Sequence, residues 1–382
     1  MAGGDGSVPP GRLGTARALG LLVAGLIGLV VASCLIGGVW LPPSVVVAVL
    51  AHQFSFGLLG SPCGPLRSGS GACTVAVEIL WDARMPAIVV ALVAGAALAV
   101  SGGVLQGLFR NPLADPFLLG LSSGAATGTA LLYAFGLFLS EQYLLLPVFA
   151  FAGALVPGLA VYAGSRSAYR SSETMVLTGV ALSTVFSALL ATLLFYNPSG
   201  GLQVSFWLLG SLSNESWTKA GLLGGALLAL GGVLGVYGRE LNVLQLGPDV
   251  ATSVGVETPR VVRRLILLTT LLTAAAVAFT GVIGFVGLVS PHVVRRLIGP
   301  DYRRVLPAAA LFGGIFLLAS WDLAQLLVGT TVAIGAAAHG YGWGAFRPGA
   351  VPTVVLPVGI PTAFVGGPFF LYLLYRHRSG GP

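Results

Sequence analysis

About ten long apolar runs, separated by short polar connections, restrict what this chain can fold into. Roughly 20 apolar residues are needed for a helix to cross a bilayer. Only 8% of the 382 residues are charged, and the alternating pattern of a membrane barrel is absent. Because backbone groups in lipid must find partners within their own segment, we predict an all-α polytopic membrane protein with about ten transmembrane helices in one bundle. The runs cover approximately 18–40, 85–109, 118–139, 143–164, 174–196, 218–237, 265–284, 285–298, 305–328 and 357–375.

Basic residues predict the orientation of this bundle. If the N-terminus is cytoplasmic and the runs alternate, most of the 19 lysines and arginines fall inside, as the positive-inside rule expects. The exceptions are Arg67, Arg84, Lys219 and Arg347. We therefore expect a multi-pass protein of the cell membrane with both termini cytoplasmic. The net charge of +7 follows from this topology and from anionic lipid headgroups, and no stretch suggests nucleic-acid binding.

The orientation divides the chain into a cytoplasmic tail (1–16), a transmembrane domain (17–376) and a second cytoplasmic tail (377–382). The first run has an alternative interpretation, because Val31 to Cys34 resembles a bacterial lipoprotein cleavage site. We favour a membrane span, since the apolar run continues beyond Cys34 and cleavage would spoil the alternation of sides.

Cys63 and Cys73 lie in the predicted outer loop 57–74, which is rich in Gly, Ser and Pro. A disulfide between them is expected in an oxidising compartment. The alternative is two free thiols in a loop.

Several kinds of chemistry lack their residues. A phosphate-binding P-loop needs a lysine followed by Ser or Thr, whereas Ala220 follows the only lysine, Lys219. No spacing of His or Cys brings two metal ligands onto one face, so we predict no catalytic residue, no metal and no cofactor on this chain. An ion-coupled carrier usually buries several carboxylates, and Asp322 is the only acid well inside a run, where a helix-to-helix hydrogen bond is its simpler role.

Two polar stretches carry local signals. In NPLADP (Asn111 to Pro116), Asn-Pro and Asp-Pro are each a preferred N-cap followed by proline at the first helical position. This predicts a short turn followed by the third span. In the stretch from Leu241 to Arg264, Pro248 opens a short helix and Gly255 ends it, and the stretch is too polar to cross the bilayer.

In these stretches and three others the chain resembles the FecCD-type permeases of binding-protein-dependent ABC importers for iron-siderophores, haem and cobalamin. The resemblance runs in order from about residue 17 to 376. The matching stretches are RMPAIVVALVAGAALAVSGGVLQGLFRNPLADPFLLGLSSGA from Arg84, WLLGSLSNESW from Trp207, LNVLQLGPDVATSVGV from Leu241, GVIGFVGLVSPHVVRRLIGPDYRRVLP from Gly281 and LPVGIPTAFVGGPFF from Leu356.

The resemblance implies a ten-helix subunit that forms a dimer around a central path. Two ATPase subunits that hold ATP and Mg would lie beneath the dimer, and an extracytoplasmic solute-binding protein above it. The substrate would be a metal chelate or a corrinoid. For the path residues, the alternative is hydroxyls that bond carbonyls of their own helix. For the coupling segment, the alternative is a solvated cytoplasmic loop. The implied positions are a cytoplasmic gate at Asn111, Pro112, Leu113, Ser171, Ser172, Glu173 and Thr174, a path at Thr184, Ser187 and Ala191, and ATPase coupling at Gly247, Pro248, Asp249, Gly255 and Glu257.

The chain departs from the family pattern where relatives contact the binding protein. Ala87, Gln325 and Val355 stand where relatives carry charge, and the outer segment 329–353 is unusually long. Docking is therefore assigned only to Arg84, with Arg347 as a replacement contact. The function that we predict is an importer permease working by alternating access, and the alternative is an ion-coupled secondary transporter on a similar scaffold.

Overall fold

The computed structural model describes residues 14–39, 41–58, 70–137, 144–164, 172–338 and 356–379. These residues form helices and connecting loops without any strand, which confirms the predicted all-α class. Seven helices within these ranges are long and apolar enough to cross a membrane. The protein is therefore a polytopic membrane protein.

Each predicted run contains a helix. Three of the helices, α5, α14 and the apolar part of α16, are shorter than a full crossing. The helices that match the runs are α1 (Thr15–Leu35), α4 (Met85–Phe109), α5 (Leu121–Ala134), α6 (Leu145–Gly164), α7 (Ser172–Tyr196), α9 (Trp217–Ala226) with η3 (Leu227–Gly231) and α10 (Gly232–Val236), α13 (Thr258–Thr280), α14 (Val286–Ile298), α15 (Tyr302–Ala338) and α16 (Gly359–Ser379).

Other helices were not expected from the apolar runs. A π-helical turn, η1 (Glu78–Arg84), joins α3 (Ser70–Val77) to α4, so that the second run becomes one continuous helix of 37 residues from Cys73 to Phe109. The remaining unexpected helices are α2 (Pro43–Phe54), α8 (Pro198–Leu208) and α11 (Gly238–Leu244).

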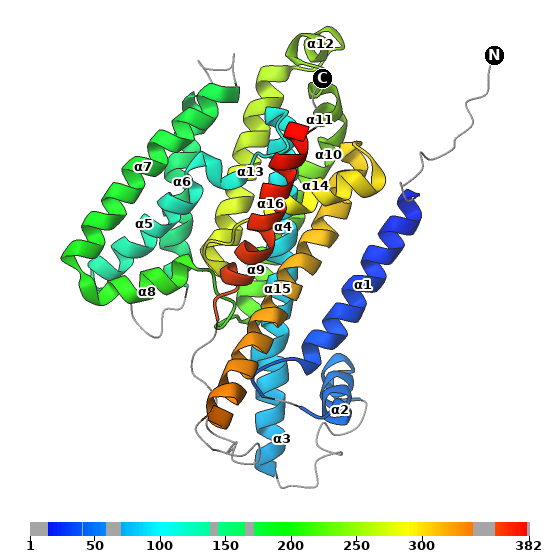
Figure 1. Ribbon diagram of the computed structural model, residues 1–382, viewed down its shortest axis with the longest axis vertical. Helices are drawn as coiled ribbons and strands as arrows, with labels where there is room; N and C mark the ends of the chain where they lie inside the picture. The colour runs from blue at the N-terminus through cyan, green and yellow to red at the C-terminus, as the bar shows by residue number, and fades with distance from the viewer. Residues whose placement is uncertain are drawn as a thin grey trace.

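Helix α4 is the centre of the bundle (Figure 1). In the most apolar 18-residue stretch of the helix from Cys73 to Phe109, 83% of the residues are buried. Helices α15, α14, α13 and α9 all pack against α4. Such close packing depends on glycine, because a Cβ at Gly95 would lie 2.2 Å from the carbonyl oxygen of Gly313 in α15. Likewise, a Cβ at Gly102 would lie 1.9 Å from the carbonyl oxygen of Gly287 in α14. Small residues thus let helix backbones approach closely, as membrane bundles require.

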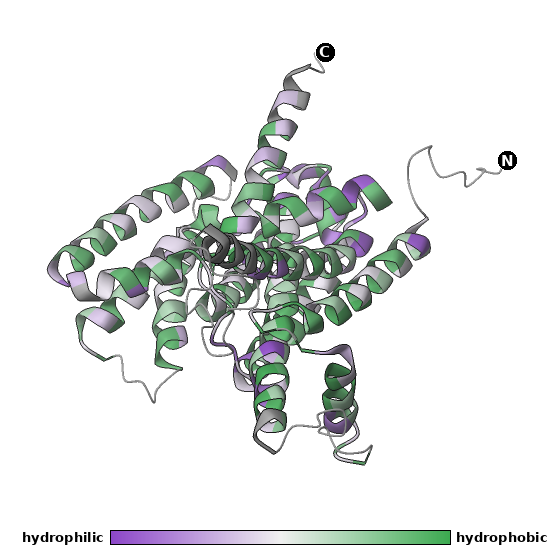
Figure 2. Ribbon diagram, turned by 60° about the horizontal axis from the view of Figure 1, so that its bottom comes forward, coloured by the Kyte–Doolittle hydropathy of each residue, from purple (hydrophilic) through white to green (hydrophobic). Residues whose placement is uncertain are grey.

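The two ends of the bundle differ in what they carry. The start of α1, the end of α16 and the short helix α12 (Pro248–Ser253) lie towards one end, and α2 and α3 lie at the other (Figure 1). Apolar residues run along the lengths of the helices, and polar residues gather near helix ends (Figure 2). We call the end with α12 the α12 end, and the opposite end the α3 end.

The contact between Gly95 and Gly313 generates a prediction about stability. We expect Gly95→Ala to lower the thermal unfolding midpoint of the purified protein, because the added methyl group meets backbone that cannot move aside. Overpacking of this kind costs about 1 to 3 kcal/mol. Gly25→Ala in α1 is the matched control, since nothing lies within 4 Å of its added Cβ. Equal midpoints for the two variants would contradict the close packing of α4 on α15.

Candidate functional site

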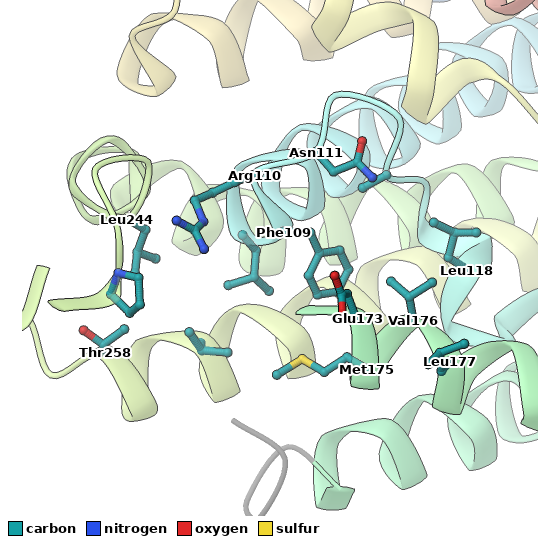
Figure 3. A pocket seen from close by; sticks show the side chains of 14 residues that line it. Phe109, Arg110, Asn111, Leu118, Glu173, Met175, Val176, Leu177, Leu244 and Thr258 are labelled. Atoms are coloured by element: carbon teal, nitrogen blue, oxygen red, sulfur yellow. The ribbon is translucent and has the colours of Figure 1, made fainter. Parts of the chain in front are cut away.

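A cavity of about 960 Å³ opens near the α12 end, between the end of α4, the start of α7 and the start of α13. Residues of two predicted groups, the cytoplasmic gate and the ATPase-coupling positions, line it together. Asn111 follows α4, Glu173 belongs to the first turn of α7, and Pro248 opens α12. The side chains of Arg110, Phe109 and Met175 also reach it (Figure 3). Segments far apart in the sequence therefore meet at one place.

The NPLADP loop (Asn111–Pro116) has the local geometry that its residues predict. The Oδ1 atom of Asn111 accepts a hydrogen bond from the N–H of Leu113 (2.9 Å), and Oδ1 of Asp115 accepts one from the N–H of Phe117 (2.9 Å). A 3-10 turn, η2 (Pro116–Leu119), follows the second cap and leads into α5. Burial raises the pKa of the Asp115 carboxyl to about 6, and its bond to the Phe117 N–H opposes that rise.

The turn η2 is pressed against α7. A Cβ at Gly179 of α7 would lie 2.0 Å from the carbonyl oxygen of Leu118, so only glycine allows this approach. Gly120, which ends η2, has φ of +80° in the left-handed region, where glycine is at no steric disadvantage. The NPLADP loop is consequently held between α4 and α7, and a shift of either helix would displace it.

The residues 245–257, which we call the 245–257 segment, lie at the α12 end. Helix α12 begins at Pro248 and Gly255 lies beyond its end with φ of +88°, as the sequence predicts. Gly247 has φ of +112° and turns the chain from α11 into α12. Asp249 is exposed, and exposed Glu257 pairs with Arg260. The segment does not cross the bundle, and most of its residues are exposed.

Three apolar side chains are exposed on this segment. Leu246 precedes α12, Val250 lies within it and Val254 follows it, and they are 68%, 42% and 63% exposed. Apolar side chains that surround a polar loop in this way are typical of a protein-binding surface.

Three residues predicted to line a path lie on α7. Thr184, Ser187 and Ala191 are all exposed. In the most apolar 18-residue stretch of α7, only 6% of the residues are buried within the chain. The hydroxyl of Thr184 donates to the carbonyl of Val180 in its own helix (3.1 Å), which was the neutral alternative for this residue. The path itself stays a prediction, since the exposed face of α7 also suits lipid or a second subunit.

Arg84 is buried near the α3 end, with 6% of its surface exposed. Its guanidinium donates to the carbonyl oxygens of Cys34 (2.7 Å) and Val39 (2.8 Å), and a Cβ at Gly37 would lie 2.3 Å from it. Arg84 therefore anchors the C-terminal end of α1, where a cation also stabilises the helix dipole. Contact with a binding protein would require the side chain to leave both carbonyls, so the docking role stays a prediction that this arrangement does not favour.

Asp322 joins two helices, as the simpler interpretation of its sequence context expects. Its Oδ2 atom accepts a hydrogen bond from the hydroxyl of Ser33 in α1 (2.5 Å). This bond pins α1 to α15 close to the point where Arg84 holds α1 from the other side. Among the described residues, no three His, Cys, Asp or Glu side chains gather as a metal site would need.

Glu215 and Lys219 form an ion pair at the α3 end. Glu215 is buried, and its Oε2 atom lies 3.7 Å from Nζ of Lys219 one turn later. Burial raises the pKa of the Glu215 carboxyl to about 7, although Lys219 opposes the rise. Lys219 is thus engaged locally at the start of α9 and is not presented as an isolated charge.

Part of the predicted site lies outside the described residues. This applies to Ser171, Cys63, Arg347 and Val355. Cys73 is disulfide-bonded, and its expected partner, Cys63, lies outside the described residues. Cys34 is free and buried. The first part of the outer segment 329–353 is helical, because α15 continues to Ala338.

Comparison with known proteins decides the family, because the model of the FecCD transport family matches residues 25–340. The chain belongs to this family. It is 38% identical over 305 residues to the cobalamin import system permease protein BtuC of Halobacterium salinarum, covering 80% of this chain and 75% of that protein. It is 37% identical to the hemin transport system permease protein HmuU of Yersinia pestis, covering 81% and 90%. These relatives are transport permeases and not enzymes.

A third relative and a solved structure agree with this assignment. The achromobactin transport system permease protein CbrC of Dickeya dadantii is 35% identical, over 90% of this chain and 92% of that protein. An inward-facing structure of a metal-chelate type ABC transporter matches with a TM-score of 0.74 and 28% identity, covering 94% of this chain and 99% of that one. The chain is a membrane-embedded permease of the FecCD family.

Sequence reasoning missed several residues of the site. Arg110 lines the cavity in the left-handed conformation, with φ of +51°, and Met175 lines it from α7. A polar residue inside an apolar run was the available signal for Gln106, which is 1% exposed, since buried polar groups in a membrane need partners. No comparable signal distinguishes Met175 from the other apolar residues of its helix.

The anchoring of α1 can be tested on Arg84. We expect Arg84→Met to lower the thermal unfolding midpoint, because the carbonyls of Cys34 and Val39 lose a charged donor and such hydrogen bonds contribute about 1.5 to 3 kcal/mol each. Arg260→Met is the control, since Arg260 belongs to an exposed pair with Glu257 that is worth at most about 1 kcal/mol. An unchanged midpoint for the Arg84 variant, together with lost affinity for a binding protein, would show that the guanidinium faces outward.

Proposed function

We propose that this chain is the transmembrane permease subunit of a binding-protein-dependent ABC importer for an iron-siderophore, haem or cobalamin. Membership of the FecCD family supports this class, and the substrates named for the relatives are cobalamin, hemin and achromobactin. The single observation that carries the mechanism is the cavity at the α12 end, where Asn111, Glu173 and Pro248 meet.

The 245–257 segment is the proposed contact with the ATPase subunits. It exposes the apolar side chains of Leu246, Val250 and Val254 close in sequence to the polar positions Asp249 and Glu257. An apolar centre with a polar rim is the usual composition of a protein interface. ATP and Mg would be bound by two such partner subunits, one beneath each copy of the permease.

The central path is proposed to form between two copies of this chain. Helix α7 buries little of its apolar surface within one copy, so a second copy would cover part of it. Thr184, Ser187 and Ala191 would then face the path. The gate at its cytoplasmic end would consist of Asn111, Pro112 and Leu113 from the NPLADP loop, with residues 171–174 from the start of α7.

The proposed mechanism is alternating access. Closure of the ATPase subunits on ATP would move the 245–257 segments, and rigid helices would convert this movement into opening and closing of the path. The permease forms no covalent bond. It contributes surfaces that bind its partners differently in each state, and the extracytoplasmic binding protein delivers the substrate.

Orientation in the membrane is proposed from the basic residues. The α12 end would be cytoplasmic and the α3 end, with Arg84 and Glu215, would face outward towards the binding protein. The alternative function is an ion-coupled secondary transporter. No described cluster of buried carboxylates favours it, and its distinguishing property is independence from ATP.

Reconstitution into proteoliposomes tests the proposal. With the co-encoded ATPase and binding protein, we expect ATP-dependent uptake of one probe among a ferric siderophore, haemin and cobalamin. Val254→Arg should reduce this uptake about tenfold or more, because a charge placed in a desolvated interface costs several kcal/mol. Gly14→Arg is the control, since it adds the same charge at the same end of the bundle with nothing within 4 Å. Uptake driven by an ion gradient without ATP would instead establish the secondary transporter.

A further inference from the structure

Helix α11, which leads into the 245–257 segment, is fastened to the start of α15. Nδ2 of Asn242 donates to Oδ1 of Asp301 (2.6 Å), and the N–H of Tyr302 donates to Oδ1 of Asn242 (2.8 Å). At the first residue of α11, a Cβ on Gly238 would lie 2.9 Å from Cα of Arg303. The two helices therefore meet through backbone at Gly238 and through the amide nitrogen and oxygen of Asn242.

Helix α11 is also fastened to the end of α4. Nε2 of Gln245 donates to the carbonyl oxygen of Gly107 (2.5 Å). Gly107 allows this approach, because a Cβ there would lie 3.0 Å from the side chains of both Leu241 and Tyr302. The NPLADP loop begins at Asn111, directly beyond this last turn of α4, so the bond from Gln245 ends close to the start of that loop.

Gln106, the neighbour of Gly107, ties α4 to α14. Its Nε2 atom donates to the carbonyl oxygens of Gly287 (3.3 Å) and Leu288 (3.2 Å). Pro291 lies four residues after Gly287 and has no N–H, so the Gly287 carbonyl lacks its usual partner within the helix. The side-chain amide of Gln106, in the neighbouring helix α4, supplies the missing donor.

Arg295 connects Gln106 to Tyr302. Its guanidinium donates to Oε1 of Gln106 and to the hydroxyl of Tyr302 (2.9 Å), and it lies 5.9 Å from the centre of the Tyr302 ring. Gln106 and Tyr302 are 1% and 2% exposed, so these bonds form where water does not compete. We call Gln106, Asn242, Gln245, Arg295 and Tyr302 the polar ring.

We propose that the polar ring makes the 245–257 segment and the NPLADP loop move as one body, with Gln245 as the positioning residue that joins them. This inference rests on the proposed function, in which the first element receives the movement of the ATPase and the second closes the path. The backbone supports the same link, because the N–H groups of Leu246 and Gly247 bond the carbonyls of Val243 and Leu244. A displacement of α12 thus reaches α11, then α4 through Gln245, and then the loop.

The first test uses the full-length chain alone in lipid nanodiscs, with hydrogen–deuterium exchange as the readout. Gln245→Glu keeps the size of the side chain and removes the donor to the Gly107 carbonyl. We expect exchange in the peptide covering residues 107–114 to become about five- to tenfold faster, because the net value of one hydrogen bond is about 1 kcal/mol. Gln203→Glu on exposed α8 is the matched control. Unchanged exchange at 107–114 in the Gln245 variant overturns the link.

The second test uses the assembled transporter and separates linkage from stability. With cysteine at Asn111, crosslinking across the dimer should depend on ATP, and Gln245→Glu should abolish that dependence while the unfolding midpoint stays within a few degrees of that of the unmodified chain. Gln245→Lys, which restores a donor, should recover at least half of the response. An unchanged ATP response in Gln245→Glu overturns the inference.

The two tests distinguish the inference from the function on which it rests. If no ATP-dependent uptake of any probe is found, the proposed function fails, whereas the exchange experiment on the chain alone still reports whether Gln245 holds the loop. If uptake is found and exchange at 107–114 does not respond to Gln245, only the inference fails.

Discussion

The close packing of α4 is the constraint on which the rest of the structure depends. This helix is enclosed by α15, α14, α13 and α9, and lipid offers no hydrophobic force to bring apolar helices together. What holds them is contact between backbones at Gly95 and Gly102, which side chains larger than hydrogen would prevent. Because α4 also continues from η1 at one end to the NPLADP loop at the other, its rigidity connects the two ends of the bundle.

Polar side chains occupy the two ends of α4 in different ways. At the α3 end, Arg84 holds the last carbonyls of α1. At the α12 end, Gln106 and Gln245 connect α4 to α14 and α11. Charged and amide groups are costly within a membrane unless they are paired, and here each donates to a backbone carbonyl of another segment. The proposed path, in contrast, is assigned to small residues on the exposed face of α7.

The sequence predicts the spans well because apolar length alone decides them, and it predicts the starts of η2 and α12 because Asp115-Pro116 and Pro248 fix the local backbone. It did not predict α8, although Asn197-Pro198 carries the same signal and Asn197 caps that helix through Gly200. Nor could it place Arg84, because one arginine at the end of an apolar run suits either an exposed contact or a buried anchor. Which of these forms depends on Gly37, in the connection that follows α1, a tertiary property that local patterns do not contain.

The meeting of the NPLADP loop and the 245–257 segment at one cavity was beyond local reasoning for the same reason. In the mechanism that we propose, these two elements form one body. It is tested most directly by the distance between spin labels at Asn111→Cys and Asp249→Cys, in dimers with a single labelled subunit, without nucleotide and with ATP bound. We expect the same distance in both states, while the distance between labels at Asn111→Cys in the two subunits changes. A change in the distance within one subunit would contradict it.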